Sequence, residues 1–190
     1  MKMKIARLVL TIMLFAVSLT ASAQKFAVST NTLDIINLGT INLQANYAVA
    51  QHWTLTLQGR YNNWSFGSVE KGNPFQNRSR GGALGARYWF WYTYSGWWVA
   101  ANARFDEYNR GGLFGMTETE EGRALGAGLA VGYSRMLSEH WNLDFGLGAW
   151  AGGTKYTTYA CPRCGMLLDQ GTKFFALPSP DCQVSFVYIF

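Results

Sequence analysis

Two histidines are the residues whose type and neighbours most readily suggest catalysis. Each precedes a tryptophan, in QHW at 51–53 and in EHW at 139–141. A histidine acts as a general base in acyl transfer when a serine and a carboxylate converge on it. The surrounding sequence predicts that His52 and His140 occupy equivalent short turns at one end of the molecule, away from any such serine and acid. We therefore interpret both as polar turn residues, and we expect no catalytic residue and no enzymatic activity.

Three cysteines offer a second kind of chemistry. Cys161 and Cys164 form the sequence CPRC, and Cys182 follows close to the C-terminus. One Cys-x-x-Cys is half of a zinc ribbon, but no second pair and no nearby histidine completes the ligand set. Because exported proteins carry disulfides, the pattern favours a disulfide over a metal site, and we expect no metal and no cofactor. Cys182 is a candidate partner for either of the other two, which would leave one cysteine unpaired.

A set of charged residues shares the polar side of several predicted strands. Arg60, Arg87 and Arg104 fall on three consecutive strands, and Asp106 and Asp144 are in phase to join them. A buried guanidinium without a partner is too costly to retain. We therefore expect hydrogen-bonded Arg–Asp pairs that fill the lumen of a barrel. The alternative is an anion site at the outer mouth, which would accept a phosphate of lipopolysaccharide.

The elements that hold these residues show the two-residue period of β-strands. In EHWNLDFGLGAW at 139–150, every second residue from Trp141 to Ala149 is apolar. Similar alternation predicts eight strands, at 26–36, 40–49, 53–63, 82–92, 97–106, 124–135, 141–151 and 181–190. The first strand is the least regular, and a β-bulge within it is one explanation.

The segments between the predicted strands alternate in length. Short segments lie at 50–52, 93–96 and 136–140, whereas those at 64–81, 107–123 and 152–180 are long. Short turns on one rim and long loops on the other are typical of an outer-membrane barrel. Loops on a rigid scaffold are where contacts with partners tend to lie, so the three long loops are the predicted sites of contact with another protein.

Aromatic residues indicate which face of the sheet meets lipid. The apolar faces end beside the short turns in Trp53, Tyr92, Trp97, Tyr133 and Trp141. Aromatic girdles mark membrane interfaces, and the candidates for the second girdle are Tyr61, Trp64, Phe105, Tyr108 and Trp150. The other face is polar and rich in glycine, which suits the packed interior of a small barrel. We therefore predict an all-β fold, an eight-stranded antiparallel up-and-down transmembrane barrel, in preference to a soluble barrel with the apolar face inside.

Both ends of the chain fit export to the outer membrane. Residues 1–23 have a basic start, a short apolar run and a small-x-small cleavage site, which predicts a secretory signal peptide before a barrel at 24–190. Of the 16 basic and 11 acidic residues, three basic ones lie in this peptide, so 13 basic residues remain and no nucleic-acid partner is expected. The closing VSFVYIF places Phe186, Tyr188 and Phe190 on one face and resembles the insertion signal of outer-membrane barrels.

An ordered set of segments covers nearly all of the chain after residue 23. It consists of STNTLDIINLGTINLQANYAVAQHWTL, YNNWSF, RYWF, YNRGG, GYSRMLSEHWNLDFGLGAW and VSFVYIF. Together these segments resemble a Bacteroidota family of small outer-membrane β-barrel proteins with a domain of unknown function. The resemblance implies a barrel of the OmpA/OmpX type. Members of the family are often encoded beside fimbrial genes, which implies an accessory or anchoring role, and the resemblance transfers no catalytic residues.

The predicted function is that of a non-enzymatic outer-membrane barrel that anchors or assists a surface structure such as fimbriae. Its expected partners are outer-membrane lipid and a surface-assembly protein that contacts loops 64–81, 107–123 and 152–180. One alternative is a lipid-modifying enzyme of the acyltransferase or deacylase type, which would need a serine, an acid and a histidine at one rim. The other is a small pore, although the lumen of eight strands is usually filled.

Overall fold

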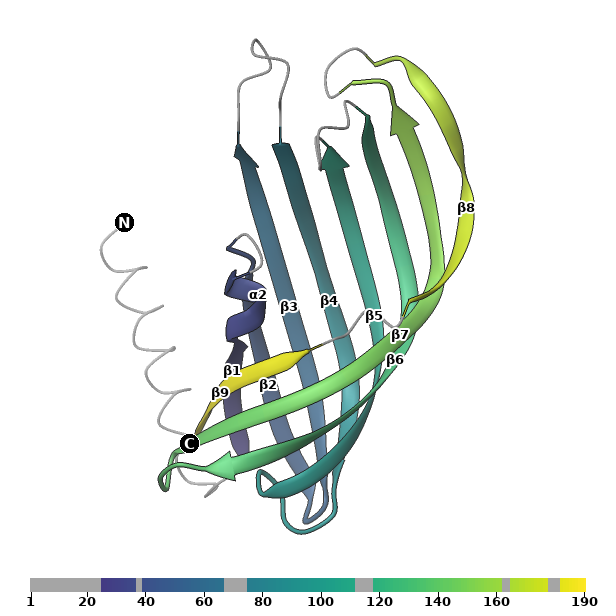
Figure 1. The fold of residues 1–190 in the computed structure, drawn as a ribbon. Helices are drawn as coiled ribbons and strands as arrows, with labels where there is room; N and C mark the ends of the chain where they lie inside the picture. Colours follow the sequence, from purple (N-terminus) through teal and green to yellow (C-terminus); the bar gives the residue numbers. More distant parts are fainter. Residues whose placement is uncertain (1–24, 37–38, 67–74, 112–117, 162–164, 178–181) are drawn as a thin grey trace, which may run out of the picture.

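A computed structural model describes residues 25–36, 39–66, 75–111, 118–161, 165–177 and 182–190 of the chain (Figure 1). The predicted signal peptide lies outside the described residues. Within these ranges one short helix accompanies nine strands: β1 Phe26–Asn31, α2 Thr32–Ile36, β2 Ile41–Ala50, β3 Trp53–Phe66, β4 Phe75–Trp89, β5 Gly96–Gly111, β6 Thr119–Met136, β7 Trp141–Tyr159, β8 Leu167–Leu177 and β9 Gln183–Ile189. Among the described residues, no helix has the length and apolarity needed to cross a bilayer.

The strands close into a barrel. Each strand from β1 to β7 pairs antiparallel with the next. β9 pairs with β1 on one side and with the lower part of β7 on the other, which completes the ring (Figure 1). β8 pairs with the upper part of β7, so β8 and β9 together take the place of one strand. The predicted all-β, eight-stranded antiparallel barrel is therefore confirmed.

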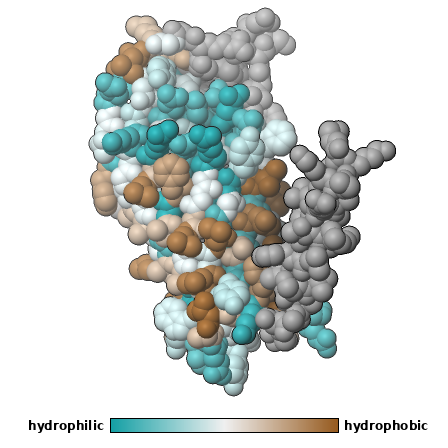
Figure 2. Space-filling model, turned by 180° about the vertical axis from the view of Figure 1, so that it is seen from behind, coloured by the Kyte–Doolittle hydropathy of each residue, from teal (hydrophilic) through white to brown (hydrophobic). Residues whose placement is uncertain are grey.

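The exterior of the barrel is apolar and its lumen is polar. Exposed large hydrophobic side chains include Leu43, Leu57, Leu84, Leu125, Leu129 and Leu147. Buried polar side chains include Asn42, Asn46, Thr54, Asn142, Asp144 and Ser185. Figure 2 shows hydrophobic residues gathered over the lower half of one face, with hydrophilic residues above them. This distribution is the reverse of that in a soluble protein, whose apolar side chains face inward.

Aromatic pairs surround the end of the barrel that carries the short turns. Trp53 packs against Tyr88, Trp97 against Tyr133 and Trp141 against Tyr188, with ring centroids 5.1, 5.4 and 5.0 Å apart. Each pair joins neighbouring strands, and the three tryptophans are about half exposed. The exposed rings form a belt of the kind that lies at a membrane interface.

The prediction of a first strand over 26–36 is wrong in its second half. β1 ends at Asn31 and α2 follows at once. The Asn31 side-chain oxygen accepts hydrogen bonds from the backbone N–H groups of Leu33, at 3.2 Å, and Val184, at 3.1 Å. Asn31 is thus the N-cap of the helix, a role that asparagine fills well. The same side chain ties the helix to the start of β9.

The three predicted long loops are largely strand. β3 extends to Phe66 and β4 begins at Phe75, β5 extends to Gly111 and β6 begins at Thr119, and β7 extends to Tyr159 and pairs there with β8. We call the zone of exposed leucines on the outer face the apolar band. The barrel wall continues well above this band as hydrogen-bonded hairpins (Figure 1). The sequence pattern missed these extensions because their outward residues are polar, so the apolar alternation that indicates a strand stops where the apolar band ends.

Candidate functional site

A buried ion pair crosses the lower lumen, which is the half of the barrel interior next to the short turns. Arg87 on β4 donates from Nη1 to Oδ2 of Asp144 on β7 at 2.7 Å, and the two side chains are only 5% and 3% exposed. The guanidinium also lies 3.8 Å from the centre of the Trp98 ring. A buried charge is tolerated only when it is paired and hydrogen-bonded. The strand phase of the two residues was enough to predict that they face the same interior.

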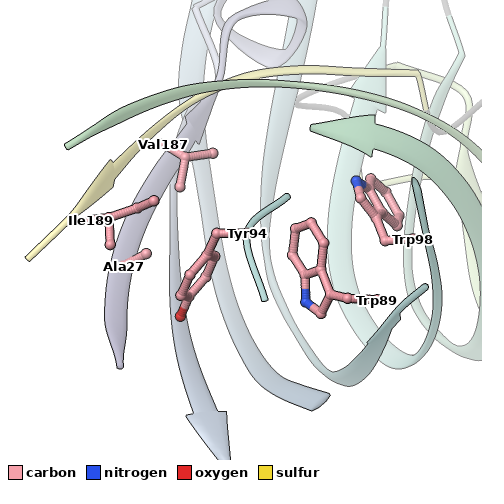
Figure 3. Packing of buried hydrophobic residues seen from close by; sticks show 6 residues of the cluster. All are labelled: Ala27, Trp89, Tyr94, Trp98, Val187 and Ile189. Atoms are coloured by element: carbon pink, nitrogen blue, oxygen red, sulfur yellow. The ribbon is translucent and has the colours of Figure 1, made fainter. Parts of the chain in front are cut away.

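Three aromatic side chains, Trp89, Tyr94 and Trp98, fill the lumen beside this pair (Figure 3). We call them the inner aromatic cluster. Trp89 donates from its indole to Thr54 at 3.1 Å, and Tyr94 donates from its hydroxyl to the carbonyl oxygens of Lys25 and Asn46 at 3.2 and 3.3 Å. All three rings are almost completely buried. The end of the barrel with short turns is thus filled with packed side chains.

Tyr94 reaches the lumen from an unusual backbone position. It lies in the turn between β4 and β5 with a φ of 65°, a left-handed conformation that costs roughly 1–2 kcal/mol for a residue with a side chain. Its carbonyl oxygen accepts hydrogen bonds from Asn142, at 2.5 Å, and from Ser134, at 3.3 Å. These bonds and the buried ring hold the strained turn against the inner face of the barrel. No glycine or asparagine occupies the position, so nothing in the sequence indicates a left-handed residue there.

A second group of charges lines an open cavity in the upper lumen. The cavity has a volume of about 860 Å³, and Arg60, Arg104 and Asp106 contribute to its wall. Arg104 pairs with Asp106 at 2.5 Å, and its guanidinium lies 4.6 Å from the centre of the Trp150 ring. The five predicted lumen charges lie at two levels of the barrel. Arg87 and Asp144 form the lower group, and the other three lie in the upper cavity.

Polar side chains surround the mouth of this cavity. The Tyr108 hydroxyl donates to Glu120 at 2.8 Å and lies 3.1 Å from the Thr154 hydroxyl. Lys173 on β8 approaches Glu120 to 3.5 Å. Desolvation raises the pKa of Tyr108, and its hydrogen bond to Glu120 raises the pKa further, so the phenol stays protonated and can donate to the carboxylate. Among the described residues, both acidic and basic side chains line the cavity, so their charges compensate one another.

Two of the five residues predicted for the upper girdle face the cavity and not the outer surface. Tyr61 and Phe105 are exposed on the outer surface as expected. Trp150 lines the cavity under Arg104, and Tyr108 faces the cavity mouth. Trp64 is 47% exposed and donates from its indole to the carbonyl oxygen of Gly39 at 3.0 Å. The prediction was wrong for Trp150 and Tyr108 because even-numbered residues of β5 and β7 point inward.

The two histidines perform the same structural task at two places on the lower rim. The Nδ1 atom of His52 lies 3.0 Å from the carbonyl oxygen of Trp89, and that of His140 lies 3.0 Å from the carbonyl oxygen of Ile189. In return, the backbone N–H groups of Trp89 and Ile189 donate to the histidine carbonyl oxygens, both at 2.8 Å. Since a carbonyl oxygen can only accept, Nδ1 carries the proton in both rings. Each histidine thus joins a short turn to the neighbouring strand.

The suggestion that Cys182 pairs with a cysteine of the CPRC segment is wrong. Cys182 is an exposed free thiol, Cys161 is disulfide-bonded, and Cys164 lies outside the described residues. Cys182 precedes Gln183, which lies opposite Gly146 in the middle of β7, whereas Cys161 follows the upper end of β7. The part of β7 between these levels, from residue 146 to 159, spans on the order of 40 Å. The Cα atoms of a disulfide are only about 4–7 Å apart.

The C-terminal aromatic residues take part in closing the barrel. Phe186 and Phe190 are exposed on the outer surface, and Tyr188 packs between Trp141 and Phe190, with centroids 5.0 Å from each. Phe190 also lies 5.5 Å from Phe26, so the last residue contacts the first strand. The predicted common face of Phe186, Tyr188 and Phe190 is where the structure places them, and their role as an insertion signal stays a prediction.

The comparison with known proteins identifies a family whose function is unknown. A family model described as a protein of unknown function, DUF3575, matches residues 9–190. No curated protein matches the sequence. Because the family model covers nearly the whole chain of 190 residues, the protein belongs to the DUF3575 family of unknown function.

Proposed function

We propose that the protein is a non-enzymatic barrel of the bacterial outer membrane that anchors or assists a surface structure such as fimbriae. The observation that carries the membrane placement is the reversed polarity of the wall. Leucine side chains such as Leu57 and Leu129 are exposed on the outside, while Asn46, Thr54 and Asn142 are buried inside. A lipid environment makes this arrangement favourable, because the outer face then lies against acyl chains.

The filled lower lumen supports a structural role over a pore. The inner aromatic cluster and the Arg87–Asp144 pair occupy the lumen at the end with short turns. The upper cavity of about 860 Å³ opens at the opposite end. A solute that entered this cavity would meet buried tryptophan and tyrosine rings below it. We therefore rank the small pore last.

The positions of the histidines argue against the lipid-modifying enzyme. A histidine that acts as a base needs a ring nitrogen directed at a nucleophile. In both His52 and His140, Nδ1 is bonded to a backbone carbonyl oxygen at the lower rim, and the upper cavity lies at the other end of the barrel. The cavity wall in the described residues contains no histidine or cysteine, and its charged groups are arginine, lysine, aspartate and glutamate.

The upper hairpins are the proposed contact with a surface protein. β8 pairs with β7 alone among the described strands, so its second edge is open. Met166, Leu167 and Leu168 at its upper end are about half exposed or more, although they lie far above the apolar band. Apolar side chains and an open strand edge outside the membrane are features that partners bind.

Site-directed cross-linking in intact cells tests the proposal. A photoreactive amino acid replaces Leu168 on β8, and the matched control places it at Leu137, which is similarly exposed in the β6–β7 turn at the other rim. We expect position 168 to cross-link to a component of a surface structure, position 137 not to do so, and both variants to fractionate with outer membranes. A mature chain found in the soluble fraction would contradict the membrane placement. Equal cross-linking of the same protein from both positions would contradict the anchoring role.

A further inference from the structure

A row of charged residues crosses the outer wall immediately above the apolar band. Arg80 on β4, Glu107 on β5, Arg123 on β6 and Lys155 on β7 lie opposite one another in consecutive strand registers. All project from the outer face, and the Arg80 and Arg123 side chains are 71% and 73% exposed. The row lines a shallow groove of about 580 Å³ on this face, together with Tyr61 and Arg78.

Positive charge is in excess along this row. Glu107 pairs with both arginines, with Arg80 and, at 2.9 Å, with Arg123. Lys155 stands directly opposite Arg123 on β6. Two residues from the row, the same face carries Arg78 on β4 and Glu121 on β6, so the groove holds four basic and two acidic side chains. Like charges directly opposite each other on neighbouring strands destabilise a sheet. One carboxylate therefore faces three cations in the row, and an anion between Arg123 and Lys155 would remove the repulsion.

The outward residues two positions from the row, toward the short turns, form an apolar surface that is recessed at two glycines. They are Gly59, Gly82, Phe105, Leu125, Gly153 and Phe174, which also lie opposite one another across the strands. Phe105, Leu125 and Phe174 are exposed. A side chain added at Gly59 or Gly153 would meet no atom within 4 Å, so the wall is hollowed there. The hollow at Gly153 lies between Leu125 and Phe174, directly below Lys155.

We propose that this part of the outer wall binds a phosphorylated, acylated lipid, with its phosphate groups spread along the row of Arg80, Arg123 and Lys155 and an acyl chain in the hollow at Gly153. Arginine and lysine bind phosphate through charge-assisted hydrogen bonds, and apolar contact with an acyl chain adds affinity in proportion to the area buried. The ligand is a lipid of the surrounding membrane and not a free anion, because the basic groups stand at the boundary of the apolar surface. The inference rests on the proposed membrane placement.

Retention of a defined lipid by the folded barrel tests this inference. The mature protein is folded in a nonionic detergent, and its binding of diphosphorylated lipid A is compared with that of the dephosphorylated lipid and of inorganic phosphate. The test variant is Arg80→Gln/Arg123→Gln/Lys155→Gln. The matched control is Arg135→Gln, which removes an exposed arginine from β6 at the opposite end of the barrel. Gly153→Leu is a second variant that fills the hollow and leaves every charge in place.

We expect the triple variant to bind diphosphorylated lipid A about tenfold more weakly, because an exposed ionic contact contributes two- to threefold in affinity. Arg135→Gln should bind like the parent, and Gly153→Leu should weaken the acylated lipid without changing the affinity for inorganic phosphate. Unchanged binding by the triple variant would overturn the inference, as would equal binding of the dephosphorylated lipid or an equal loss in Arg135→Gln. A chain that needs no detergent would instead overturn the proposed membrane placement, so the two failures are distinct.

Discussion

Replacement of Asp144 by asparagine tests the energetics of the lumen. The substitution keeps the size of the side chain and removes the charge that compensates Arg87. Both side chains are buried, with exposed fractions of 5% for Arg87 and 3% for Asp144, and Arg87 Nη1 lies 2.7 Å from Asp144 Oδ2. Removal of one partner from a buried pair costs about 3–5 kcal/mol, because the other charge stays buried without compensation. We therefore expect Asp144→Asn to lower the free energy of unfolding by about that amount.

A double-mutant cycle separates the ion pair from its surroundings. Arg87→Met removes the guanidinium and also its contact with the Trp98 ring at 3.8 Å. The variant with both substitutions buries no unpaired charge, so its loss of stability should be smaller than the sum of the two single losses by about 2–3 kcal/mol. The matched control is Arg80→Gln, on the same strand as Arg87. It breaks the exposed ion pair between Arg80 and Glu107 and should lower the free energy of unfolding by no more than about 1 kcal/mol.

Urea unfolding of the barrel in lipid vesicles, followed by tryptophan fluorescence and by gel mobility with and without heating, measures these differences. The reasoning would be refuted if Asp144→Asn lost less than about 1 kcal/mol. It would also be refuted if the two single losses added to the loss in the double variant within about 0.5 kcal/mol, because independent sites behave in that way.

Three further predictions concern the packing and the thiols. Tyr94→Ala should cost about 3 kcal/mol in the same unfolding assay, because the buried ring and its hydrogen bonds are lost while the strained turn stays; a neutral result would contradict the role of Tyr94 in filling the lumen. Gly132→Ala should destabilise the barrel by at least about 1 kcal/mol, because the added methyl group would overlap the Trp98 ring, whereas Gly153→Ala, which has open space, should be neutral. Cys182→Ser should abolish maleimide labelling of the folded, unreduced protein, and residual labelling would contradict the assignment of Cys182 as its exposed free thiol.

The sequence predicted the parts of the fold that depend on strand phase. A period of two assigns each residue to one face, and this was sufficient to place Arg87 and Asp144 in one interior and Leu57 and Leu129 outside. The same rule, applied strictly, would also have assigned Trp150 to the lumen. Trp150 was predicted to lie in the girdle because it is a tryptophan, although its strand phase assigns it to the polar face. The structure places its ring under Arg104.

The features that the sequence did not predict depend on contacts between distant segments. The helix after Asn31 forms where that side chain also binds β9, which lies more than 150 residues later. The outward faces of the upper hairpins are mostly polar, so no regular apolar alternation marks their strands. Cys182 seemed close to the CPRC segment because an intervening strand, β8, was not recognised and its length was counted as loop.

The relaxation of a spin label at Leu129 tests the direction of the strand faces most directly. Leu129 is 70% exposed on the outward face of β6, and its neighbour Ala130 packs toward the inner aromatic cluster. In the Cys182→Ser background, reconstituted into lipid vesicles, we expect a label at position 129 to be relaxed strongly by dissolved oxygen and weakly by a water-soluble nickel chelate. A label at position 129 that is relaxed more strongly by the nickel chelate than by oxygen would contradict the account.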